Sequence, residues 1–125
     1  MRRVFKTRQF AKWMRKTDLT DDALCLAVSE MVSGLVDADL GGDVLKKRVA
    51  LPGRGKRGGA RILVATRRAS RWFFVFGFEK NEKASVSRTE LEALQWLVKQ
   101  LLDLSGAQFE VAAQDGSLQE ICHEH

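Results

Sequence analysis

Apolar residues recur at helical spacing in two separate parts of the chain. The first part follows Thr20, whose hydroxyl suits a helix cap and precedes two acidic residues. The second follows Ser87-x-x-Glu90, the spacing of a capping box, and runs to about Asp103. The apolar positions are Leu24, Ala27, Val28, Met31, Val32 and Leu35 in the first part, and Leu91, Leu94, Val98 and Leu101 in the second. The pattern predicts two amphipathic helices.

Three runs between these helices have the composition of strands. Val44–Leu51 is basic and alternating, residues 60–67 are β-branched and apolar in their middle, and Arg71–Glu79 is almost entirely aromatic or valine. Because both faces of the third run are apolar, we expect it in the centre of a sheet. Residues 66–71 predict a tight hairpin turn, and residues 37–43, with two glycines, predict a loop.

The two ends of the chain give weaker patterns. Residues 3–6 predict a short strand, and Thr7 is a cap for a helix over residues 8–16. After Ser105 the pattern predicts a shorter helix, and residues 118–122 predict an edge strand. We therefore expect a small α+β fold, in which a mostly antiparallel sheet carries the N-terminal helices on one face and is followed by a C-terminal helix.

Length and composition fit one compact domain. The chain has 125 residues, of which 45% are apolar, and this is enough to bury a core. We expect the domain over residues 1–104 and a C-terminal extension over residues 105–125. No apolar run is long enough to cross a membrane and no signal-peptide core is present, which favours a cytoplasmic protein. Cys25 and Cys122 have no metal-binding or redox spacing, and we expect Cys25 to be a buried thiol.

Positive charge is concentrated in two parts of the chain. The net charge is +5, but residues 44–83 contain 12 lysines and arginines against two acidic residues. Residues 1–16 add seven cations and no acidic residue, and the remainder has two cations against 14 acidic residues. Such segregation of basic charge indicates a polyanionic partner.

Most motifs of enzymes and cofactor sites are absent. The glycine-rich stretch LPGRGKRGGARI, residues 51–62, has neither the G-K-[ST] of a Walker loop nor a GxGxxG that opens a helix. The chain has no HExxH or paired-cysteine motif, so we expect no metal and no cofactor. A serine triad needs a histidine, and both histidines lie within the last three residues.

The remaining candidate for chemistry is the basic part of the predicted sheet. If consecutive strands pair antiparallel, Arg61 and Lys80 come to the same end of the sheet. Glycines at positions 53, 55, 58 and 59 let backbone N–H groups and cationic side chains approach a phosphate closely. The cations in this part of the sheet are Lys46, Lys47, Arg48, Arg54, Lys56, Arg57, Arg61, Lys80 and Lys83.

Several stretches resemble the RelE/ParE superfamily of bacterial toxins, and most closely its HigB-type branch. They are FKTRQFAKWMRK, GLVDADLGG, KKRVALPGRGKRGGARILVATRR, RWFFVFGFEKNEKASV and ELEALQWLVKQLL. The resemblance covers residues 3–104. Its most specific parts are G-[RK]-G-K-x-G-G-x-R at residues 53–61 and G-F-x-K-N-E at residues 77–82.

This resemblance implies a fold like that of microbial ribonucleases and ribosome-dependent cleavage of mRNA. It also implies a cognate antitoxin that neutralises the toxin, expected to be a helix-turn-helix protein encoded by an adjacent gene. At Ala60 many relatives have an aromatic residue, so a base-stacking or acid role is missing here unless Phe78 or Trp72 supplies it. The positions that match the family's functional residues are Lys46, Arg48, Lys56, Arg57, Arg61, Lys80 and Asn81.

The chemistry of RNA cleavage by the 2′-hydroxyl fits the roles that the resemblance implies for these cations. Attack of a 2′-hydroxyl on the adjacent phosphate builds negative charge, which fixed cations stabilise. Arginine suits bidentate contact with phosphate, and neighbouring cations make a lysine exchange its proton more readily. We therefore expect Arg61 to stabilise the charge, and Lys56 or Lys80 to transfer the proton. The expected RNA contacts are Lys46, Arg48, Arg54, Arg57, Asn81 and Lys83.

Two alternatives stay open. Some members of the same superfamily poison DNA gyrase and usually lack a cation-rich cleft, so the density of cations here favours RNA cleavage. A non-enzymatic module that holds RNA or the ribosome by charge alone is the other alternative. It predicts steep salt dependence and no cleaved product.

Overall fold

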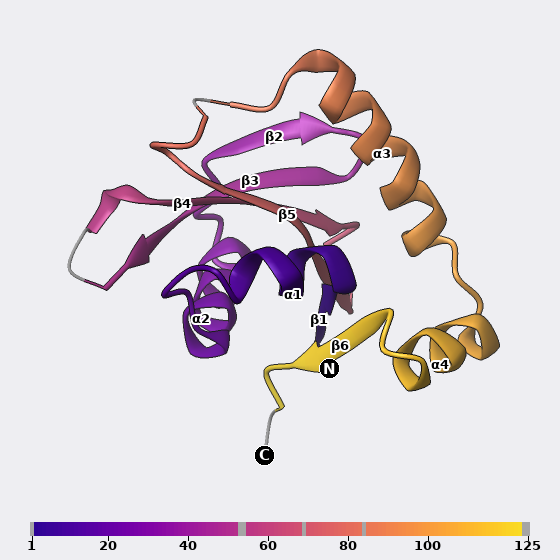
Figure 1. Ribbon diagram of the computed structural model, residues 1–125. Helices are drawn as coiled ribbons and strands as arrows, with labels where there is room; N and C mark the ends of the chain where they lie inside the picture. Colours follow the sequence, from indigo (N-terminus) through magenta and orange to yellow (C-terminus); the bar gives the residue numbers. More distant parts are fainter. Residues whose placement is uncertain (1, 53–54, 69, 84, 124–125) are drawn as a thin grey trace.

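The computed structural model describes residues 2–52, 55–68, 70–83 and 85–123, and of residues 55–58 it describes the main chain alone. The described part forms a six-stranded sheet with four helices (Figure 1). Along the chain the elements are β1 (Arg3–Thr7), α1 (Arg8–Met14), α2 (Asp21–Val32), β2 (Ala38–Gly41), β3 (Val44–Leu51), β4 (Gly55–Thr66), β5 (Arg71–Glu79), α3 (Arg88–Leu102), α4 (Gly106–Gln114) and β6 (Leu118–Ile121).

The sheet has the strand order β2-β3-β4-β5-β1-β6. Strand β1 runs parallel to β5, whereas the other neighbouring strands are antiparallel. The expected α+β class with a mostly antiparallel sheet is confirmed. The predicted edge strand near the C-terminus is confirmed as β6, which lies beside β1.

Each described helix begins at a hydroxyl cap. Thr7, Thr20, Ser87 and Ser105 each accept a hydrogen bond from the backbone N–H three residues further on. The carboxylate of Glu90 also accepts a hydrogen bond from the backbone N–H of Ser87, which confirms the predicted capping box. The helices predicted from these caps are all present, and α1 ends two residues earlier than expected.

Two hydrophobic cores lie on opposite faces of the sheet. Ile62 and Leu63 are neighbours on β4, yet they belong to different cores because side chains alternate along a strand. Helices α1 and α2 cover the Ile62 face with Phe10 and Leu24, while α3 and α4 cover the Leu63 face with Val98 and Phe109. This burial on both faces explains why β5 is apolar on both sides.

Residues 37–43, predicted as a loop, contain the strand β2 instead. Ala38 pairs with Lys46 of β3, and Gly42 and Asp43 join the two strands with φ of 60° and 65°. Positive φ at both turn residues matches the right-handed twist of a tight antiparallel hairpin. The prediction was wrong because aspartate and glycine are depleted in strands, whereas here the turn geometry allows pairing.

Strand β4 begins earlier than predicted. It starts at Gly55, which pairs with Leu51, so most of the basic glycine-rich stretch is strand rather than loop. Lys56 and Arg57 therefore lie in β4, ahead of the start at residue 60 that the sequence predicted, while Arg54 lies outside the described residues. Glycine weakens the sequence signal of a strand, which is why the start was missed.

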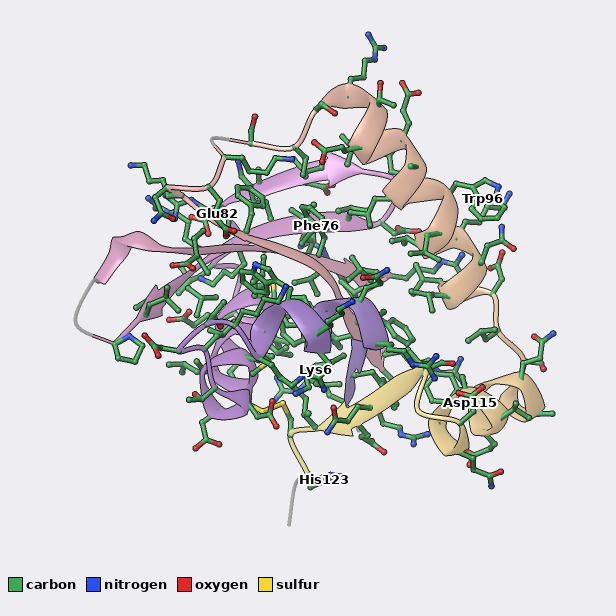
Figure 2. All side chains as sticks on the ribbon, in the orientation of Figure 1. Lys6, Phe76, Glu82, Trp96, Asp115 and His123 are labelled. Atoms are coloured by element: carbon green, nitrogen blue, oxygen red, sulfur yellow. A yellow bond between two sulfur atoms is a disulfide. The ribbon has the colours of Figure 1, made fainter. Side chains whose placement is uncertain are left out.

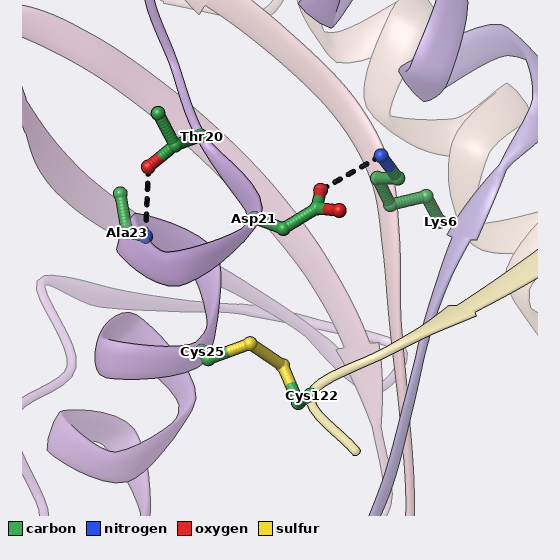
Figure 3. The surroundings of a disulfide bond; sticks show 6 residues. All are labelled: Lys6, Thr20, Asp21, Ala23, Cys25 and Cys122. Carbon is green, nitrogen blue, oxygen red and sulfur yellow. Dashed lines mark hydrogen bonds and ion pairs between the residues drawn. A yellow bond between two sulfur atoms is a disulfide. The ribbon is translucent and has the colours of Figure 1, made fainter.

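Cys25 is not the buried free thiol that we expected, because it forms a disulfide with Cys122 (Figure 3). The two cysteines are 97 residues apart, with Cys25 on α2 and Cys122 directly after β6. They meet because β6 pairs with β1 at the edge of the sheet, which brings the end of the chain beside α2. This pairing depends on the tertiary fold, and the spacing of the cysteines does not encode it.

Candidate functional site

Arg61 lies on the inner strand β4, toward the end of the sheet at which β5 ends. The strand register places it between Arg48 of β3 and Phe78 of β5. By alternation it shares the face of Leu63, the face that α3 and α4 cover further along the strand. Its side chain is partly buried, and its neighbour Ile62 is fully buried. A packed central strand therefore fixes the main chain that carries this guanidinium.

The segment after β5 lies at the end of the sheet where Arg61 is found. Glu79 pairs with Ala60, and the N–H of Lys80 donates a hydrogen bond to the carbonyl oxygen of Gly59 at 3.5 Å. The predicted convergence of the main chains at Arg61 and Lys80 is confirmed. In Figure 1 the end of β3, the start of β4 and the segment after β5 all lie on the left of the sheet.

The three consecutive cations of β3 divide between the two faces of the sheet. Lys46 and Arg48 share the face of Arg61, as their register partners on β4 show. Lys47 points to the other face, where its buried Nζ lies 3.1 Å from a carboxylate oxygen of Glu30 on α2. Because side chains alternate along β3, Lys46 and Arg48 are available as RNA contacts on one face, whereas Lys47 binds α2 on the other.

Asp37 holds Arg48 in place. Its carboxylate accepts hydrogen bonds from Nε of Arg48 at 2.9 Å and from the backbone N–H of Arg48 at 2.6 Å. Partial burial raises the pKa of Asp37, but these hydrogen bonds outweigh burial and bring the pKa below its ordinary value of 3.8. The contact between Asp37 and Arg48 was not predicted from the sequence, because it depends on the β2–β3 hairpin and this segment was predicted as a loop.

Lys83 is attached to the first turn of α3. Its Nζ lies 2.6 Å from both carboxylate oxygens of Glu90 and 5.7 Å from the ring centre of Phe76. The hydrogen bond from Lys83, together with that from the backbone of Ser87, lowers the pKa of Glu90 to about 2. Lys83 therefore fastens the segment after β5 to α3, and an RNA contact by Lys83 stays a prediction.

The remaining cations of the predicted set differ in what surrounds them. Within the described part of the chain, neither Lys46 nor Lys80 has an ion-pair partner, and Lys80 is exposed. Asn81, next to Lys80, is exposed as well. The side chains of Lys56 and Arg57 lie outside the described part, as Arg54 does entirely.

Neither aromatic residue considered for base stacking has an accessible ring. Phe78 is 3% exposed and Trp72 is 2% exposed, and Trp72 lies in the core beneath α1 and α2. Ala60 is fully buried, so the position at which relatives have an aromatic residue faces the interior here. In this structure neither Phe78 nor Trp72 supplies the missing stacking role.

Among the candidate residues whose side chains the structure describes, Arg48, Lys80 and Asn81 are exposed. An apolar groove of about 690 Å³ runs between α1, β5, α3 and α4, and a cavity of about 620 Å³ lies beside the disulfide, but the predicted site residues line neither. Among the described residues there is no group of three or more histidines, cysteines or carboxylates that could hold a metal ion. The same residues include no helix long and apolar enough to span a membrane. An open cationic surface suits an extended polyanion better than a small enclosed ligand.

Comparison with known proteins identifies the family of the chain. The family model described as the RelE toxin of the RelE / RelB toxin-antitoxin system matches residues 2–121. A search of curated proteins gave no match. The matched residues include all the strands and helices described above. That the chain belongs to the HigB-type branch stays a prediction. The chain belongs to the RelE toxin family.

Proposed function

We propose that this toxin is an endoribonuclease that cleaves mRNA on the translating ribosome and thereby inhibits translation. Toxins of this family are generally endoribonucleases. The observation that carries the proposal is the position of Arg61 on a packed central strand, in register with Arg48 and beside the segment that begins at Lys80. Fixed cations of this kind stabilise charge that develops at a phosphate.

In the proposed reaction the RNA supplies its own nucleophile. The 2′-oxygen attacks the adjacent phosphorus, the bond to the 5′-oxygen breaks, and the products are a 2′,3′-cyclic phosphate and a 5′-hydroxyl. Arg61 stabilises the charge on the non-bridging oxygens, and Lys56 or Lys80 moves the proton between the attacking and leaving oxygens. The step needs no metal ion. The RNA backbone is held by Lys46, Arg48, Arg54, Arg57, Asn81 and Lys83.

The ribosome and an antitoxin complete the proposal. Arg48, Lys80 and Asn81 are exposed, and in the proposal the ribosome holds the mRNA in the geometry for attack. The proposed site of action is therefore the cytoplasm, where translation occurs. Membership of the family implies an antitoxin partner. We propose a helix-turn-helix protein encoded by an adjacent gene as that partner.

The test compares Arg61→Gln with Arg68→Gln in a purified translation system with mapped mRNA ends. Arg68 is a matched control, because it is an exposed arginine in the turn at the other end of β4. Loss of the cation at Arg61 should slow cleavage by about 10²-fold or more, as removal of one charge-stabilising donor does in other enzymes. Arg68→Gln should cleave at nearly the rate of the unchanged protein.

Three results would contradict the proposal. Cleavage by Arg61→Gln at the unchanged rate, with a normal melting temperature, would remove Arg61 from the site. Inhibition of DNA supercoiling without mRNA cleavage would favour gyrase poisoning. Salt-sensitive binding to RNA or ribosomes without cleaved product at any concentration would favour the non-enzymatic module.

A further inference from the structure

The carboxylate of Glu82 closes the turn that follows β5. Its Oε1 accepts a hydrogen bond from the backbone N–H of Glu79 at 2.8 Å. In return the N–H groups of Glu82 and Lys83 donate to the carbonyl oxygen of Glu79 at 2.9 Å and 3.3 Å. Both main-chain polar groups of Glu79 are therefore bound by the segment that follows it.

The same turn is attached to the fold at both of its ends. The N–H of Lys80 donates to the carbonyl oxygen of Gly59 in β4, and Lys83 forms its ion pair with Glu90 on α3. Between these attachments Lys80 and Asn81 are exposed. Within the described part of the chain, neither of these two side chains has a hydrogen-bond or ion-pair partner. Figure 2 shows Glu82 on the same side of the sheet as this end of β5.

We propose that Glu82 is a positioning residue, which holds Lys80 and Asn81 beside Arg61 for contact with the RNA phosphate. This inference rests on the proposed function. A negative charge at a phosphate-binding surface repels RNA, so the charge of Glu82 weakens binding. The useful property of the side chain is its acceptor oxygen, which closes the turn and lowers the conformational entropy of the segment.

Glutamine and alanine at this position separate the acceptor from the charge. Glu82→Gln keeps a carbonyl oxygen that can accept from Glu79 and removes the negative charge, whereas Glu82→Ala removes both. In the translation assay Glu82→Gln should cleave at least as fast as the unchanged protein. Glu82→Ala should be slower by about tenfold to 10²-fold, because small misplacements of a reacting group cost rates of that order. The amide of Glu79 should exchange with solvent slowly in the unchanged protein and in Glu82→Gln, and faster in Glu82→Ala.

A double-mutant cycle with Lys80→Ala identifies the residue through which Glu82 acts. If Glu82 positions Lys80, then Glu82→Ala should add little to the loss caused by Lys80→Ala. The matched control is Glu92→Ala, since Glu92 is an exposed glutamate on α3 that pairs only with Arg88 at 3.3 Å in the described part of the chain. This control should cleave at the unchanged rate.

The outcomes distinguish this inference from the function on which it rests. If the unchanged protein cleaves, Arg61→Gln does not, and Glu82→Gln is as slow as Glu82→Ala, then Glu82 acts by its charge or its proton and the inference is overturned. Full activity of Glu82→Ala, or losses that add in the double mutant, would overturn it as well. Absence of cleavage by the unchanged protein would overturn the proposed function and, with it, this inference.

Discussion

At the scale of single residues, the cations of the site differ in what fixes them. Asp37 binds Arg48 through two hydrogen bonds, and Glu90 binds Lys83 through two more. Each acidic partner orients its cation and at the same time neutralises part of its charge. Lys80 is held by its main chain instead, so its full charge stays available to a phosphate. This contrast favours Lys80 over Lys83 as a residue of the reaction.

The ion pair of Lys83 predicts a dependence of stability on pH. The pKa of Glu90 is lowered from 4.5 to about 2 in the folded protein, so the pair contributes stability above about pH 4.5 and loses that contribution as the pH falls toward 2. We expect the unchanged protein to have a higher free energy of unfolding than Glu90→Gln at pH 7. The difference should shrink between pH 4.5 and pH 2. Urea unfolding at a series of pH values measures it.

Lys83→Ala provides the control for this prediction. The side-chain hydrogen bond from Lys83 is the largest cause of the low pKa of Glu90. When Lys83 is replaced by alanine, the effect of Glu90→Gln on the free energy of unfolding should therefore be smaller and less dependent on pH. A difference that stays constant from pH 7 to pH 2 in the unchanged background would show that the ion pair does not contribute as described.

At the scale of elements, the disulfide joins the last strand to the second helix. Residues Cys25 and Cys122 close a loop of 97 residues, which reduces the conformational entropy of the unfolded chain. In the chain-entropy model, a loop of this size corresponds to about 4–5 kcal/mol of stability. We expect a reducing agent to lower the free energy of unfolding by up to that amount in urea titrations.

The double variant Cys25→Ser with Cys122→Ser is the control for the effect of reduction. Its stability should match that of the reduced protein and should not respond to the reducing agent. If oxidised and reduced protein unfold at the same urea concentration, then the disulfide adds nothing to the packing of α2 and to the pairing of β6 with β1, which the Arg3–Glu120 ion pair supports.

Local signals in the sequence predicted the elements that depend on local chemistry. The capping box from Ser87 to Glu90 and the strands Val44–Leu51 and Arg71–Glu79 need no distant partner to be recognised, and each was found at its bounds. Strand β2 was missed because its composition resembles a loop and only pairing with β3 makes it a strand.

The candidate site was predictable in part for the same reason. Antiparallel pairing brought Arg61 and Lys80 together from the order of the strands alone. The acidic residues around the site were not predictable, since Asp37 and Glu90 reach their cations through the hairpin and the packing of α3. The partner of Cys25 depends in the same way on how β6 lies in the sheet.

At the scale of the whole molecule, the fold gathers much of the basic charge at one end of the sheet. The chain has a net charge of +5. Arg48, Arg61 and Lys80 lie toward this end, whereas Arg67, Arg68 and Arg71 lie toward the end where β4 leads into β5. Two separate cores pack against the two faces of the central strands, and the paired residues Leu51 and Gly55 lie at the same end of the sheet as the turn after β5. We therefore attribute stability to the cores and propose that RNA binds at this end.

The most direct test uses ribosomes that carry an mRNA with one 2′-deoxy nucleotide on the 5′ side of the mapped cleavage position. We expect cleavage of the all-ribose mRNA only when ribosomes are present, with 2′,3′-cyclic phosphate and 5′-hydroxyl ends. We expect no cleavage at the 2′-deoxy position, because the attacking oxygen is missing. Cleavage of the 2′-deoxy mRNA at the same position and rate, or products with 5′-phosphate ends, would overturn the proposed mechanism.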